Sequence, residues 1–128
     1  MTTYSGRNLP SSGSFELYAW FFMRVSGLLL LFLAIGHLVI MHVINNIDQI
    51  NYQFVANRWV GSWGFFWRTY DGSMLILALI HGLNGLRTIL DDFLRPGGRR
   101  TLCMALLYVC GFIFLMLGLL TVVTFTPR

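Results

Sequence analysis

Three long apolar stretches constrain this chain more than any other feature of its sequence. They cover about residues 20–44, 71–93 and 101–125, and each is long enough to cross the ~30 Å hydrocarbon core of a bilayer as a helix. Charged residues make up only 11% of the chain, against about 25% in soluble proteins, and the mean hydropathy is +0.68. We therefore predict an all-α membrane protein with three transmembrane helices.

The segments outside these stretches are polar or interfacial. Residues 1–17 are predicted to form a polar N-terminal arm, and residues 18–128 a single membrane domain. Within residues 45–70, Trp59, Trp63 and Trp67 recur at a helical spacing, which predicts an amphipathic segment lying in the membrane interface. Asp71 is predicted to cap the start of the second helix. The basic, Gly/Pro-rich residues 95–100 predict a tight turn before the third helix.

Charge and cysteine usage exclude several classes of protein. The net charge is +4, but the basic residues are all arginines spread over the membrane edges, which argues against nucleic-acid binding. Cys103 and Cys110 match no zinc, iron–sulfur or covalent haem motif and are interpreted as packing residues. The sequence shows no signal or transit peptide pattern, so we expect a bacterial or archaeal plasma membrane.

Arginine asymmetry predicts the orientation of the chain in the membrane. With three spans, Arg95, Arg99 and Arg100 lie on the same side as the N-terminus. Cytoplasmic loops carry an excess of basic residues, so the N-terminus is predicted to be cytoplasmic. Arg58 and Arg68 on the opposite side count against this orientation.

The second apolar stretch carries polar residues, which a membrane helix rarely contains without a function. At about 100° per residue, His81, Gly85, Thr88 and Asp92 share one helix face. His81 and Asp92 are about 16 Å apart along the axis, which places His81 near the midplane and Asp92 at the cytoplasmic interface. Arg87 points elsewhere, but its long side chain can reach the same interface.

A histidine near the midplane can be a haem axial ligand, a proton carrier or a hydrogen-bonded packing group. Gly85 favours the haem ligand, because a porphyrin lying against a helix needs missing side chains beside its ligand. His37 is predicted at a depth close to that of His81, as a second ligand or a hydrogen-bonding neighbour. His42 is expected near the outer interface, where it is solvated.

Arg24 and Ser26 are predicted to open the first helix on the side where Asp92 ends the second. Together with Arg87 and Asp91 they are expected to gather at one membrane face. The alternative is that the arginines anchor helix ends to lipid phosphates while the aspartates face water.

The order of these motifs resembles one family. Arg24-x-Ser26-Gly27 near the start of a first span, H-G-x-x-G-x-R-x-x-x-x-D from His81 to Asp92, a basic turn and a third span are similar to the membrane anchors of succinate dehydrogenase. These are small cytochrome b-type subunits, and the hydrophobic, SdhD-like anchor is the more similar of the two types. The resemblance runs from about residue 18 to the C-terminus.

The resemblance implies a complex in which a flavoprotein oxidises succinate and an iron–sulfur subunit carries the electrons. This chain and a second membrane anchor would hold haem b and a quinone, either ubiquinone or menaquinone. His81 would ligate the haem iron, with the other axial ligand supplied by the companion anchor. Arg24 or Arg87 would pair with haem propionates or lie on the quinone side.

The resemblance also implies that Asp92 and Ser26 belong to the quinone side. In the family the aspartate is usually followed by a tyrosine, whereas this chain has Phe93. The quinone contact of the missing hydroxyl would then come from the companion and iron–sulfur subunits, from a water or from Arg87.

Two alternative functions stay open. One is a fumarate reductase anchor that works in the opposite direction. The other is a non-redox scaffold or a small transporter subunit. A transporter is expected to show midplane carboxylates or broken helices, whereas here the acids lie at helix ends and Gly82 and Gly85 have no proline beside them.

Overall fold

The computed structural model describes residues 14–126, and this part of the chain is helical with short connections. Its elements in chain order are α1 (Ser14–Val39), the π-helical turn η1 (Ile40–Ile44), the 3-10 turn η2 (Ile47–Gln49), α2 (Tyr52–Val60), α3 (Gly64–Phe93) and α4 (Gly98–Thr124). Three segments are long and apolar enough to cross a membrane, namely Ser14–Ile44, Gly64–Phe93 and Gly98–Thr124. The predicted fold with three transmembrane helices is confirmed.

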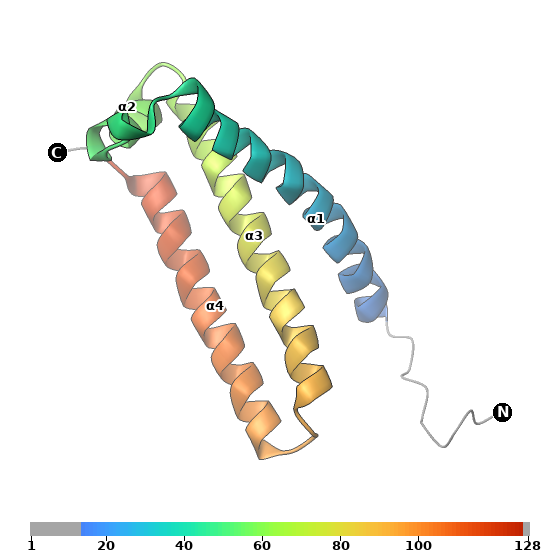
Figure 1. Ribbon diagram of the computed structural model, residues 1–128. Helices are drawn as coiled ribbons and strands as arrows, with labels where there is room; N and C mark the ends of the chain where they lie inside the picture. The colour runs from blue at the N-terminus through green and yellow to red at the C-terminus, as the bar shows by residue number, and fades with distance from the viewer. Residues whose placement is uncertain (1–13, 127–128) are drawn as a thin grey trace.

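The three long helices form a single layer with α3 in the middle (Figure 1). The start of α1 and the turn between α3 and α4 lie at one end, called here the hairpin end, and α2 lies at the other, the α2 end (Figure 1). Among the described residues, Met41 and Ala56 are the only apolar side chains classed as buried. Both faces of the layer are therefore open to lipid or to other subunits.

The first helix starts earlier than predicted. It begins at Ser14, so residues 14–17, predicted to belong to the polar arm, are helical. Arg24 lies about 15 Å along the axis from this start, so the prediction that Arg24 and Ser26 open the helix is wrong. The aromatic residues before Arg24 suit the interface and contain no helix breaker, so the helix runs through them. Residues 1–13 of the predicted arm lie outside the described part.

The interfacial segment is shorter than predicted. Trp59 belongs to α2, Trp63 lies in the following turn and Trp67 belongs to α3, so the three tryptophans do not share one helix. The break occurs after Gly61, which ends α2 and lets the chain fold back. Gly64 then begins α3 so close to the carbonyl of Trp59 that a side chain there would overlap it.

Asp71 is not a helix cap, because α3 begins at Gly64, about two turns before it. Its Oδ2 atom accepts a hydrogen bond of 2.8 Å from the indole Nε1 of Trp59. An acid before an apolar run looks the same in sequence whether it caps a helix or accepts a bond from another segment.

The predicted turn between the second and third spans is confirmed. Gly97 adopts a φ of +154°, a conformation that residues with a side chain rarely take. Asp91 accepts a hydrogen bond of 2.8 Å from Nε of Arg100 across this turn. Further along, α3 and α4 approach so closely that a Cβ on Gly111 or Gly118 would overlap a leucine of α3.

Candidate functional site

His81 lies in the middle of the central helix and contacts α1. Its Nδ1 atom is 2.8 Å from Oγ of Ser26. A Cβ atom on Gly27 would lie 3.3 Å from Cε1 of the imidazole, so the ring packs against the α1 backbone. Residues 24–27 and 81–92, the two motifs of the sequence, therefore meet in space.

The hydrogen bonds of Ser26 define the tautomer of His81. The hydroxyl donates its proton to the carbonyl of Phe22, with an O–O distance of 2.6 Å. A hydroxyl has one proton, so Oγ must accept toward the imidazole, and Nδ1 must carry the hydrogen. In the neutral imidazole the other ring nitrogen, Nε2, then carries the lone pair, and it makes no hydrogen bond within residues 14–126.

A groove of about 540 Å³, called here the polar groove after its charged and polar side chains, opens between α1 and α3 beside Gly85. It is lined by Glu16, Ala19, Trp20, Met23, Arg24, Asn84, Gly85, Arg87, Thr88 and Ile89. A Cβ on Gly82 would have no atom within 4 Å, and one on Gly85 would meet only Cε of Met23 at 3.6 Å. The open space predicted from these glycines is present.

A second groove, of about 430 Å³, is mainly apolar and involves all three long helices. Its wall includes Phe15, Phe22 and Leu83, with Tyr108 contributed by α4. Asn84 and Arg87 line both grooves. These two polar side chains therefore lie between the two grooves, near the hairpin end.

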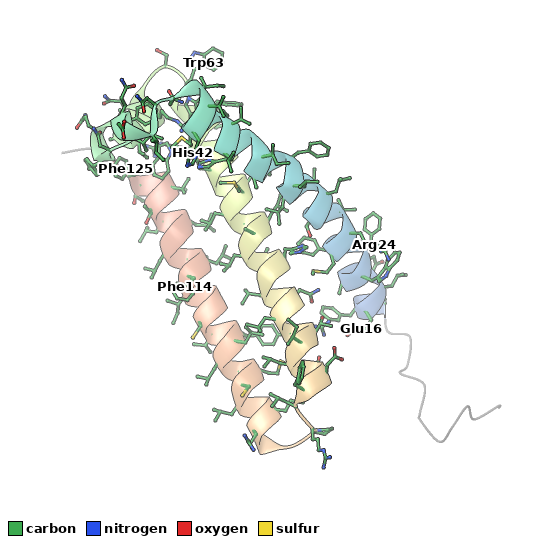
Figure 2. The ribbon with its side chains drawn as sticks, viewed as in Figure 1. Glu16, Arg24, His42, Trp63, Phe114 and Phe125 are labelled. Carbon is green, nitrogen blue, oxygen red and sulfur yellow. The ribbon has the colours of Figure 1, made fainter. Side chains whose placement is uncertain are left out.

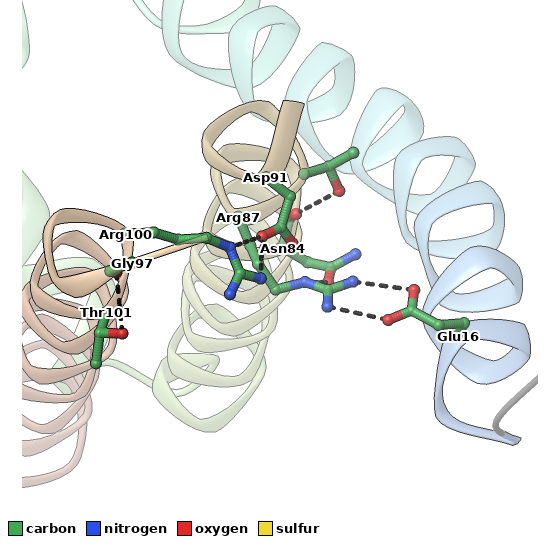
Figure 3. A network of polar contacts seen from close by, with 8 residues as sticks. Glu16, Asn84, Arg87, Asp91, Gly97, Arg100 and Thr101 are labelled. Carbon is green, nitrogen blue, oxygen red and sulfur yellow. Dashed lines mark hydrogen bonds and ion pairs between the residues drawn. The ribbon is translucent and has the colours of Figure 1, made fainter. Parts of the chain in front are cut away.

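The two arginines of the polar groove are held in different ways (Figures 2 and 3). Arg87 donates from Nη1 and Nη2 to the two carboxylate oxygens of Glu16, at 3.2 and 3.3 Å, and from Nε to Asn84 at 3.2 Å. Arg24 stacks on the ring of Trp20 at 4.4 Å and pairs with no carboxylate in the described part of the chain. The guanidinium of Arg24 therefore remains available to an anionic group.

The residues predicted to gather at one membrane face are divided. Ser26 lies deeper, beside the histidine. Asp91 is paired with Arg100 across the turn (Figure 3). Asp92 is exposed, and its carboxylate makes no hydrogen bond or ion pair with any residue from 14 to 126. Only the two arginines share a groove.

His37 lies toward the α2 end. Its Nδ1 is 3.7 Å from Oδ1 of Asp71, and its ring stacks on Tyr70 with centroids 6.5 Å apart. Because Ser26 is level with His81, His37 is about 16 Å farther along α1. The prediction that both histidines share one depth is wrong, since it measured depth from too late a helix start. The two rings therefore cannot ligate the same iron.

His42 lies near the α2 end, as predicted from its distance along the first helix (Figure 2). It is exposed, and its Nδ1 is 3.2 Å from the carbonyl of Leu38. This contact lies within its own helix, so His42 is not linked to the grooves.

Sequence reasoning missed two polar contacts of the site. Glu16 was assigned to the arm, although it lies in the first turn of α1 and pairs with Arg87. Asn84 is an unspecified position in the motif from His81 to Asp92, so the motif did not single it out. A helix that starts at Ser14 places Glu16 near the depth of Arg87, so this helix start would have suggested the contact between them.

No cluster of three or more His, Cys, Asp or Glu side chains occurs within residues 14–126. Cys103 and Cys110 are free thiols. The described site therefore offers one imidazole nitrogen, one unpaired guanidinium and two grooves, rather than a cage of metal ligands.

These features define a multi-pass helical membrane protein with a hydrogen-bonded histidine in its central span. The sequence profile of the succinate dehydrogenase/fumarate reductase transmembrane subunit matches residues 7–117. The chain belongs to this family, and the resemblance found from its motifs is confirmed. A search of curated proteins found no match.

Proposed function

We propose that this chain is a membrane anchor of succinate:quinone oxidoreductase that helps to bind haem b and quinone and docks the flavoprotein and iron–sulfur subunits. The observation that carries the proposal is the setting of His81, with Nδ1 held by Ser26 and Nε2 without a hydrogen-bond partner in the described chain. A neutral imidazole with one free nitrogen is the form that ligates iron.

The residues around His81 fit a porphyrin. Gly82 and Gly85 leave space beside the ligand, which a Cβ would reduce. The guanidinium of Arg24, in the adjacent groove, suits a propionate, and Arg87 can serve the same end if Glu16 releases it. The second axial ligand is assigned to the companion anchor, since His37 lies too far from His81. When bound, haem b supplies electron transfer.

The quinone is assigned to the hairpin end, where Asp92 is exposed and unpaired in the described chain. Reduction of a quinone to a quinol takes up protons and electrons in equal number, so an acid at the water interface can relay the protons. Phe93 is 83% exposed and supplies an apolar contact but no hydroxyl. The hydrogen bonds to the quinone oxygens therefore fall to the partner subunits, a water or Arg87.

The arginine distribution supports a cytoplasmic hairpin end, where the flavoprotein and iron–sulfur subunits would dock. The turn between α3 and α4 and the start of α4 carry Arg95 and Arg99, which are exposed, and Arg100, which is half-buried. Of the arginines toward the α2 end, Arg68 caps the last turn of α4 and Arg58 stacks 3.8 Å above the Trp67 ring, so both have structural roles.

The spectrum of the purified complex tests the haem assignment. A reduced-minus-oxidised difference spectrum should show b-type haem, and His81→Ala should abolish or severely perturb it. His42→Ala is the matched control, because it removes an exposed histidine whose Nδ1 lies against the carbonyl of Leu38, one turn earlier. Copurification of the flavoprotein and iron–sulfur subunits verifies assembly. An unchanged haem spectrum in the assembled His81→Ala complex would refute the ligand assignment.

A further inference from the structure

Ser26 is unusual among the polar side chains of this open helical layer. It is only 1% exposed, and it is the one buried polar side chain within the described residues. Most of α1 around it is exposed to the membrane or to partners. A hydroxyl that is removed from all solvent in an apolar layer needs its hydrogen bonds satisfied within the protein.

Both hydrogen bonds of the hydroxyl are present, and their directions are fixed. The proton goes to the carbonyl of Phe22 on the preceding turn, and a lone pair accepts from Nδ1–H of His81. Gly27 provides the space for the ring, because its missing side chain lets Cε1 approach the helix. Ser26 and Gly27 thus form a seat that fixes both the position and the tautomer of the imidazole.

We propose that Ser26 is a positioning residue that sets the donor strength of His81 toward iron and thereby lowers the reduction potential of the haem. This inference rests on the proposed haem ligation by His81. An acceptor at Nδ1–H draws the proton away from the ring, so Nε2 becomes a stronger donor. A stronger donor stabilises ferric over ferrous iron, and hydrogen bonds outside the ligand shell are one of the levers by which proteins tune haem.

A hydroxyl suits this position better than a carboxylate. A charged side chain at this depth would cost about 2.5–3.5 kcal/mol on insertion scales, whereas a serine bonded to its own helix adds no charge. The chain of bonds from the imidazole of His81 to Ser26 and on to the Phe22 carbonyl also polarises each member. The seat therefore strengthens the ligand without an ion in the membrane.

Redox titration of the haem in the purified complex, followed optically, tests this role. Ser26→Ala should retain haem but raise its potential, because the Nδ1–H loses its acceptor. We expect a change on the order of tenfold in the ferrous:ferric equilibrium, which corresponds to about 59 mV for one electron. Ser26→Cys, with a weaker acceptor of similar shape, should give a smaller rise, and Ser26→Thr, which keeps a hydroxyl, should restore the low potential.

Thr121→Val is the matched control. Its hydroxyl makes the same type of bond to a carbonyl one turn earlier, Leu117 at 2.8 Å, but it lies on α4 away from His81. The haem in the Thr121→Val complex should have the same reduction potential as the haem in the unaltered complex. If the Ser26→Ala complex does not assemble, the haem potentials of the Ser26→Cys and Ser26→Thr complexes test the role of Ser26 instead.

Two outcomes separate this inference from the proposed function. If His81→Ala removes the haem signal but all Ser26 variants keep the original potential, the role of Ser26 is refuted and the haem assignment stands. If the unaltered complex contains no haem, both are refuted.

Discussion

At the scale of single residues, two neighbouring acids at the end of α3 have different surroundings. Asp91 is tied to Arg100, whereas Asp92 is exposed and unpaired within residues 14–126. If Asp92 relays protons to the quinone, Asp92→Asn should slow quinone reduction on the order of a hundredfold, since positioned acids contribute about 10²–10⁴-fold. Succinate oxidation with an artificial electron acceptor should continue at the original rate, because it bypasses the anchor.

The neighbouring acid is the control for this change. Asp91→Asn removes the same charge one position away but weakens only the tie to Arg100. Its quinone reduction should stay close to the original rate. Equal slowing by both variants would mean that the general negative charge of the helix end, and not Asp92 itself, supports the reaction. Loss of both activities in Asp92→Asn would indicate failed assembly.

The candidate site could be predicted where it depends on one helix and not where it depends on two. The stripe with His81 and Gly85 follows from the helical period alone, and the open space beside it is present. The pairing of His81 with Ser26 depends on the register between α1 and α3. That register follows from tertiary packing and from the true start of α1, so Ser26 and His37 were both assigned to the wrong depth.

At the scale of elements, Arg68 holds the end of α4. Its Nη1 and Nη2 atoms donate to the carbonyls of Val122, Val123 and Phe125 at 3.0, 2.9 and 2.6 Å, while Nε donates to Trp59 at 2.9 Å. The last carbonyls of a helix lack partners within it and carry partial negative charge, so a cation there is stabilising. One side chain thus joins α2, α3 and α4.

Replacing Arg68 by Met should therefore loosen the last turn of α4 without adding a polar group to α3. Hydrogen bonds to charged groups contribute about 1.5–3 kcal/mol each, so we expect at least that loss of local stability. Hydrogen exchange of the amides in the last turn should become at least tenfold faster. Arg95→Met, in the exposed turn, should leave this exchange unchanged. Unaltered exchange in Arg68→Met would show that the cap contributes little.

Element boundaries show the same division between local and tertiary signals. The number of spans and the turn at Gly97 follow from local sequence and are confirmed. The tryptophan spacing suggested one amphipathic segment, but the chain breaks at Gly61 and continues into α3. Interfacial aromatic residues suit either arrangement, so their spacing alone could not fix where one helix ends and the next begins.

At the scale of the whole molecule, the layer of three helices is incomplete by itself. The polar groove lies between α1 and α3 and opens onto the exposed surface of the layer, and the apolar faces of α1 and α4 are largely uncovered. A porphyrin set against His81 would be covered on one side only by this chain. The arrangement therefore fits an anchor that shares its cofactor with a companion subunit, as proposed above.

The orientation of this layer in the membrane gives the last prediction. Ser62, in the exposed turn after α2, and Gly98, at the start of α4, mark opposite ends of the molecule. A side chain at Gly98 would have no atom within 4 Å of its Cβ, so cysteine is tolerated there. In a background with Cys103 and Cys110 replaced by Ala, a thiol reagent that does not cross membranes should label Ser62→Cys in intact cells but not Gly98→Cys. Inverted vesicles should give the opposite pattern.

The physical reason for this expected pattern is the basic turn beside Gly98, which is retained on the cytoplasmic side during insertion. Labelling of Gly98→Cys from outside would reverse the orientation. It would also move Asp92 away from the side on which the iron–sulfur subunit is expected to deliver electrons.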